Sequence, residues 1–181
     1  MDCYFDDEKV GLSWERYDEA DHSKSEWYAE LNKQLNNWRS ENIKQYITYS
    51  IPVGDQMMAF LDINSGLYFC FENRDLVGVV FMTEPFNDEF DASMIEYIVV
   101  NPDAQGRGVG TRMIKSIKDN PMFFTSGKHR GKIQASVKPS NIASQKAFLK
   151  NGFRVVKPAK KIPTTLYYRF EYRDNDHSLS N

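Results

Sequence analysis

A loop with three glycines in five residues, from Gly106 to Gly110, is the feature that most limits how this chain can fold. The apolar run IEYIVV precedes it and residues with helical spacing follow it, which predicts the order strand, loop, helix. Glycine lets the backbone turn sharply and approach a bound group, and amides at the start of a helix lack partners within the helix. The stretch therefore predicts a binding site for an anion.

Two common glycine motifs do not fit this loop. A dinucleotide-binding fingerprint needs a glycine at its sixth position, which Thr111 occupies here. A nucleoside-triphosphate loop needs a lysine between its last glycine and the following Ser or Thr, but Gly110 and Thr111 adjoin. A tight turn without a ligand gives no reason for all three glycines or for Gln105 and Arg107 beside them.

The other patterns predict helices inserted between strands, a mixed α/β (α+β) chain. Trp27, Leu31, Leu35 and Trp38 recur at the spacing of one helical face, which predicts a helix over 23–39 with a stripe that packs on the core. From Gly66 onwards, short runs rich in Val, Ile, Tyr and Phe indicate strands. The expected strands are LYFCFE, LVGVVFMTE and SMIEYIVV as an antiparallel meander, then KIQASV, FRVVK and TTLYYRFEYR. Helices are expected from Val109 to Asn120-Pro121 and from Asn141 to Asn151-Gly152.

Composition limits the number of domains and the classes of partner. A chain of 181 residues, 41% of them hydrophobic, is long enough for one well-packed domain. A net charge of -2 and a pI near 5.9 give no overall attraction to nucleic acid or acidic lipid. The N-terminus lacks the pattern of a signal peptide, and no run approaches the ~18 apolar residues of a membrane span. We expect a cytoplasmic protein with a disordered tail over 173–181.

Cysteine and histidine usage indicates neither disulfides nor a metal. Cys3 and Cys70 lie far apart, which is typical of thiols in a reducing compartment. His22, His129 and His177 have no second ligand at metal-binding spacing.

The loop sequence resembles a known family. Gln105 to Gly110 fit the signature Gln/Arg-x-x-Gly-x-Gly/Ala of the GNAT family of N-acetyltransferases. A second block is similar to the asparagine-led helix and closing Gly-Phe of that family; it consists of Asn141, Ser144, Gly152 and Phe153. The resemblance spans roughly 66–172. It implies a GNAT-like mixed, mostly antiparallel sheet of six to seven strands flanked by helices.

The resemblance also implies a domain plan and a donor. We expect one acetyltransferase domain over 1–172, with a strand and helices over 1–65 on the acceptor side and 66–172 as the coenzyme-binding core. Acetyl-CoA is the expected donor, bound without a metal, because amides at the positive end of a helix dipole can satisfy a pyrophosphate. The expected coenzyme-binding residues are Ile98, Val100, Gln105, Gly106, Arg107, Gly108, Val109, Gly110, Thr111, Asn141, Ser144 and Phe148.

The resemblance implies Glu96 as the general base. By the period-two rule Glu96, Ile98 and Val100 share one face of their strand, so a carboxylate would point to an otherwise apolar side. In the family a glutamate on this strand often acts through water. An edge charge, or a pair with a lysine, is the alternative interpretation of Glu96.

The group that protonates the leaving thiolate stays open. The family often places a tyrosine four residues before the closing glycine, and this chain has Phe148 there. Ser144, one helical turn earlier, is the catalytic hydroxyl that related subfamilies imply, although it also suits coenzyme binding alone. Tyr167 and Tyr168 on the last strand are the other candidates.

Two functions of different classes follow. The first is an acetyl-CoA-dependent N-acetyltransferase acting on a primary amine of a small molecule or protein. The second is a non-catalytic acyl-CoA-binding or sensing module, which Phe148 favours. A transferase acting on charged tRNA needs a basic surface that a pI of 5.9 does not supply. We expect an amine substrate as partner, no nucleic acid or membrane, and leave a homodimer open.

Overall fold

The computed structural model describes residues 4–17, 25–38, 65–84, 92–125, 131–156 and 168–173. The strands are β1 (Tyr4–Asp7), β2 (Leu12–Arg16), β3 (Ser65–Glu72), β4 (Asp75–Thr83), β5 (Ser93–Val100), β6 (Lys132–Val137), β7 (Arg154–Val156) and β8 (Tyr168–Arg173). The helices are α1 (Ser25–Asn37), the 3-10 turn η2 (Pro102–Ala104), α4 (Val109–Asp119), α5 (Pro121–Phe124) and α6 (Ile142–Lys150).

The strands form one sheet in the order β1-β2-β3-β4-β5-β6-β8-β7. Every neighbouring pair is antiparallel except β5 and β6, which run parallel. The predicted mixed, mostly antiparallel fold is confirmed, and the strand that contains IEYIVV runs parallel to the strand KIQASV. Within the described residues the sheet has eight strands, more than the six to seven predicted, because the N-terminal segment forms a hairpin of two strands, β1 and β2, where one strand was expected.

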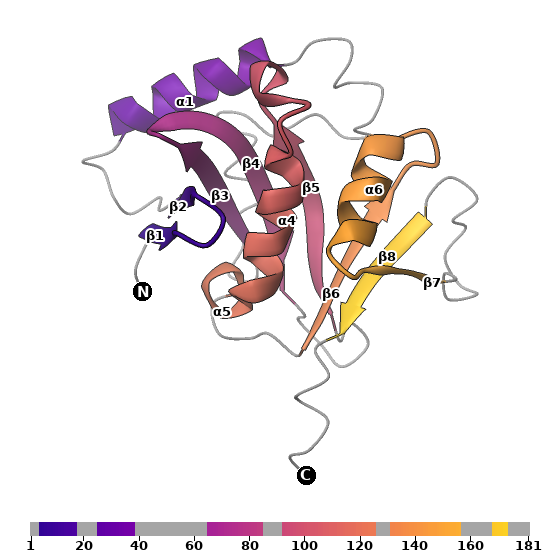
Figure 1. Cartoon of the computed structure of the whole chain (residues 1–181). Helices are drawn as coiled ribbons and strands as arrows, with labels where there is room; N and C mark the ends of the chain where they lie inside the picture. Colours follow the sequence, from indigo (N-terminus) through magenta and orange to yellow (C-terminus); the bar gives the residue numbers. More distant parts are fainter. Residues whose placement is uncertain are drawn as a thin grey trace.

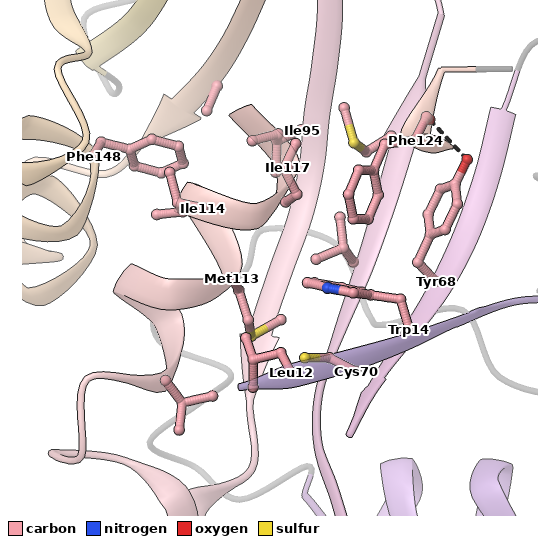
Figure 2. Packing of buried hydrophobic residues seen from close by; sticks show 14 of the residues in the cluster. Leu12, Trp14, Tyr68, Cys70, Ile95, Met113, Ile114, Ile117, Phe124 and Phe148 are labelled. Atoms are coloured by element: carbon pink, nitrogen blue, oxygen red, sulfur yellow. Dashed lines mark hydrogen bonds between the residues drawn. The ribbon is translucent and has the colours of Figure 1, made fainter. Parts of the chain in front are cut away.

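Helices α4 and α6 lie side by side in front of the sheet (Figure 1). Beneath them the buried Trp14, Tyr68 and Phe124 pack edge to face or tilted, with ring centroids 4.9 to 5.0 Å apart (Figure 2). The Tyr68 hydroxyl donates to the Phe124 carbonyl at 2.7 Å, and burial raises the pKa of Tyr68, so the phenol stays neutral. Helix α4 contributes Met113, Ile114 and Ile117 to the same core.

Helix α1 covers the opposite face. The predicted apolar stripe is confirmed where side chains are described: Leu31 and Trp38 are buried, and Trp27 stacks on Phe71 with a centroid distance of 5.9 Å. Strand residues of the second cluster include Leu67, Phe69, Val79, Phe81 and Val99. No helix in the described ranges is long and apolar enough to cross a membrane.

A buried polar network ties the N-terminal hairpin to α4. Ser116 accepts a hydrogen bond from the Trp14 indole at 2.9 Å and donates to Asp7 at 2.6 Å. Asn120 also donates to Asp7, at 3.0 Å. The side chains of Asp7 and Ser116 are buried, so each of these groups depends on the others for its partners.

Candidate functional site

The site begins where β5 and β6 separate. Their parallel pairing covers only Ser93 to Ile95 on β5, opposite 133–135 on β6. Beyond this point β6 continues against β8, while the remaining part of β5 has no β6 partner. The two strands are therefore paired only at the start of β5 and are unpaired where β5 runs into the glycine loop. An opening of this kind exposes backbone N–H and C=O groups of β5 between the strands.

A cavity of about 360 Å³ lies at this opening. It is lined by the end of β5, the glycine loop, the first turns of α4 and the start of α6. Ten of the twelve residues predicted for coenzyme binding line it: Ile98, Val100, Gln105, Gly106, Gly108, Val109, Gly110, Thr111, Asn141 and Ser144. Five lining residues were not predicted: Val99, Ala104, Ile114, Ala143 and Ala147. Ala147 lies three residues after Ser144 and four after Ala143, so helical spacing was a usable signal for these two alanines.

The glycines have the geometry that a ligand loop requires. Gly106 and Gly108 have φ values of 78° and 77°, which side-chain-bearing residues rarely adopt. A Cβ atom at either position would meet no protein atom within 4 Å, so the space beside them is open. At Gly110 a Cβ would lie 3.3 Å from Val100, so that glycine serves close packing of α4 on β5.

Helix α4 presents an uncapped N-terminus to the cavity. Gly108 is the N-cap residue and has no side chain to cap the helix. Its carbonyl accepts from the Arg112 amide at 3.1 Å, so the amides of 109–111 precede the first bond of this helix. These amides and the helix dipole favour a negatively charged group at this end.

The side chain of Arg107 does not line the cavity, so a contact of this residue with the coenzyme through its backbone amide stays a prediction. The side chain pairs instead with Glu72 at the end of β3. Arg112 pairs with the same carboxylate at 2.6 Å, and Lys115 pairs with Asp119. The side chains of Arg107, Arg112 and Lys115 therefore each have an acidic partner within the fold.

Phe148 also lies outside the cavity. It is 1% exposed and packs edge to face on Phe153, with ring centroids 5.0 Å apart. The ring faces the core below α6, so the structure places Phe148 in the packing of that core and not in the cavity lining (Figure 2). Asn141, by contrast, lines the cavity and caps α6, its side-chain oxygen accepting from the Ser144 amide at 3.1 Å.

Glu96 lies in a β-bulge. Phe81 of β4 faces Tyr97, and the next residue, Met82, faces Ile95, so Glu96 has no residue opposite it. Glu96 is exposed, and its carboxylate accepts a hydrogen bond from Thr83 at 3.0 Å.

The bulge corrects the predicted facing of β5. Ile95 and Ile98 both pack in the cluster under α4, although strict alternation would put them on opposite faces. Thr83 lies two residues after Phe81, which belongs to the cluster under α1. The bond to Thr83 therefore holds Glu96 on the α1 side of the sheet, away from Ile98 and Val100.

The other candidate hydroxyls are only partly described. Ser144 lines the cavity from α6. Tyr168 begins β8, but its side chain is not described, and Tyr167 lies outside the described residues. The three histidines, His22, His129 and His177, and the residues after Arg173 also lie outside the described residues. Within the described ranges no group of three or more His, Cys, Asp or Glu could hold a metal ion.

Solved structures with the same fold include several acetyltransferases. Aminoglycoside acetyltransferase AAC(6')-Ib in complex with coenzyme A has 17% identity and a TM-score of 0.65, covering 90% of this chain and 94% of its own. N-acetyltransferase PseH of Campylobacter jejuni has 15% identity and a TM-score of 0.59, and the match covers 90% of this chain and 98% of PseH. RimL, a ribosomal L7/L12 alpha-N-protein acetyltransferase in complex with coenzyme A, has 15% identity and a TM-score of 0.63, covering 90% and 92%.

No curated protein sequence matches the chain significantly. The family model described as Acetyltransferase (GNAT) family matches residues 24–153, well over half of the chain. That match includes the glycine loop, the splayed strands and the α6 helix with its closing Gly152-Phe153. The chain therefore belongs to the GNAT family of acetyltransferases.

Proposed function

We propose that this protein transfers an acetyl group from acetyl-CoA to a primary amine. The observation that carries the proposal is the cavity at the β5–β6 opening, lined by glycines that leave open space and by the uncapped start of α4. When bound, acetyl-CoA supplies the thioester whose acetyl group is transferred.

The residues around the cavity fit the coenzyme. The amides of 106–111 would hold the pyrophosphate, since they lie at the positive end of α4 and a Cβ at Gly106 or Gly108 would occupy the ligand's space. The unpaired edge of β5 offers backbone groups to an extended arm. Asn141 uses its side-chain oxygen as a cap, so its amide nitrogen is the group proposed to donate to that arm.

Glu96 is proposed as the general base. An amine with the pKa of a lysine is almost fully protonated at neutral pH, so a base within reach, directly or through one water, must accept its proton. Glu96 is exposed in the bulge, and the hydrogen bond from Thr83 orients its carboxylate. This position directs the acceptor to the α1 side of the sheet, opposite to the helices that line the coenzyme cavity.

Ser144 is proposed to protonate the leaving thiolate. It lines the cavity one helical turn before the buried Phe148. We further propose a single domain over 1–172, with 1–65 on the acceptor side. Pairing of β2 with β3 supports a single domain, and the packing of α1 on the face of the sheet that holds Glu96 supports the acceptor-side assignment.

Thiol release from acetyl-CoA tests the proposal. The purified protein would be given acetyl-CoA with polyamines, an aminoglycoside, free amino acids and peptides with a free N-terminus or lysine. Amine-dependent release of free thiol, with an acetylated product of matching mass, is expected. Tight coenzyme binding with no release above the amine-free rate across the panel would favour the non-catalytic acyl-CoA-binding module instead.

A further inference from the structure

One carboxylate connects the glycine loop to the rest of the sheet. Glu72 ends β3, and its two oxygens accept hydrogen bonds from different arginines. Arg107 belongs to the glycine loop and Arg112 to the first turns of α4. The two guanidinium groups hold the pKa of Glu72 below its usual value, chiefly through the hydrogen bond from Arg112, so the carboxylate is ionised at neutral pH.

Arg107 occupies a special place in the loop. It stands between Gly106 and Gly108, both with positive φ, and its side chain pairs with Glu72 and does not line the cavity. Glycine at such positions permits many backbone conformations, most of which would not aim the amides at one point. A side-chain anchor between the two glycines limits that freedom.

The other end of the anchor is itself held in place. Arg112 bonds to Glu72 at 2.6 Å and donates through its other terminal nitrogen to the Val10 carbonyl at 3.1 Å. Val10 is in the turn between β1 and β2. Glu72 is thus fixed between the sheet, α4 and the N-terminal hairpin before it meets Arg107.

We propose that Glu72 is a positioning residue for coenzyme binding, which holds the glycine loop open toward the cavity by anchoring Arg107 on the outside. The inference rests on the proposed function, because it assigns the loop to the coenzyme pyrophosphate. It also assigns Arg107 to the anchor rather than to direct contact with phosphate.

The two possible roles of Arg107 predict opposite changes in coenzyme affinity when Glu72 is replaced. Replacing Glu72 by Gln removes one negative charge near the loop, which by electrostatics alone strengthens the binding of an anion. If Glu72 merely sequesters Arg107 from the phosphates, coenzyme affinity should therefore rise. If the anchor orders the loop, the loop conformation that binds the coenzyme becomes a minor one in the Glu72→Gln variant. The apparent Kd then rises in proportion, about tenfold where that arrangement holds about a tenth of the population.

The experiment compares Glu72→Gln with Asp75→Asn. Asp75 begins β4 at the other side of the same two-residue turn and is exposed, so its variant removes the same charge without touching Arg107. Coenzyme A affinity would be measured by calorimetry, and hydrogen exchange of amides 105–111 would be followed in the ligand-free proteins. We expect Glu72→Gln to weaken binding about 5- to 50-fold and to speed exchange in the loop, with Asp75→Asn near wild type.

A double variant completes the test. Glu72→Gln with Arg107→Gln should bind coenzyme A no more weakly than the weaker single variant, since both changes break one anchor. Unchanged or tighter binding by Glu72→Gln, or unchanged exchange in the loop, would overturn the inference. Failure of the wild-type protein to bind coenzyme A would instead refute the proposed function, so the two failures are distinguishable.

Discussion

Replacing Gly108 by Val should greatly weaken coenzyme binding and leave the fold largely intact. Gly108 has a φ of 77°, and a valine held there is strained by about 1 to 3 kcal/mol. A Cβ at this position meets no protein atom within 4 Å, so no clash adds to that strain. Because 1 kcal/mol shifts the melting temperature of a chain of this size by about 2 to 4 °C, we expect a fall of about 2 to 12 °C.

The loss of affinity should be far larger. The valine side chain would fill the open space beside the loop and keep the pyrophosphate from the amides. A hydrogen bond to a charged group contributes about 1.5 to 3 kcal/mol, and the loss of two such bonds weakens binding by about 10² to 10⁴-fold. Calorimetric titration with coenzyme A measures this, alongside thermal unfolding of the ligand-free protein.

Gly152→Val is the matched control. Gly152 has a φ of 81°, a Cβ there also meets nothing within 4 Å, and the residue follows α6 outside the cavity lining. The Gly152→Val protein should lose about as much stability as the Gly108→Val protein and keep its affinity for coenzyme A. Equal affinity in Gly108→Val and Gly152→Val would show that the loop does not hold the pyrophosphate, and the assignment of 106–111 would be wrong.

Three further substitutions test other parts of the site and fold. Glu96→Gln should lower turnover by about 10² to 10⁴-fold with coenzyme affinity unchanged, and the deficit should shrink as the pH rises and free amine accumulates; full activity at pH 7 would exclude Glu96 as the base. Asn141→Ala should raise the Kd of coenzyme A more than it lowers the melting temperature, whereas the reverse would limit Asn141 to its observed role as the α6 cap. Ser116→Ala leaves the buried Trp14 indole and Asp7 carboxylate each short of a partner, so unfolding in urea should show a loss of about 2 to 4 kcal/mol, and a loss under 1 kcal/mol would contradict the network.

Local patterns predicted most of the fold because they report on local physics. The spacing of Leu31 and Trp38 identified the helix that became α1, and the runs rich in β-branched and aromatic residues identified β3, β4 and β5. The glycine loop was predictable for the same reason, since Gly106 and Gly108 were needed for positive φ and open space. The N-terminal hairpin was missed because its first strand has only four residues and two adjacent acidic ones.

The sequence was less informative wherever the outcome depends on residues far apart in the chain. The ion pair of Arg107 was not predicted, because its partner Glu72 is 35 residues away and lies beside it only after the sheet forms. The bulge at Glu96 has a similar origin, because it arises from the pairing of β5 with β4 and interrupts the period-two rule. A facing inferred from alternation holds only up to the first bulge.

At the position of Phe148 the family resemblance implies both packing of the core and a tyrosine hydroxyl that supplies a proton, and this chain keeps only the packing. The Phe148 ring is buried against Phe153, so this position of α6 contributes packing to the core and does not form the cavity wall. A tyrosine there would bring a hydroxyl that needs a partner when buried, whereas phenylalanine keeps the packing without that demand. The fold therefore tolerates the loss of the family's usual acid, but the chemistry does not, because a departing thiolate still requires a proton. Ser144 lies on the same helix one turn earlier and lines the cavity. The proton donor we propose is therefore on α6, as in the family, but one turn before the position of the usual tyrosine.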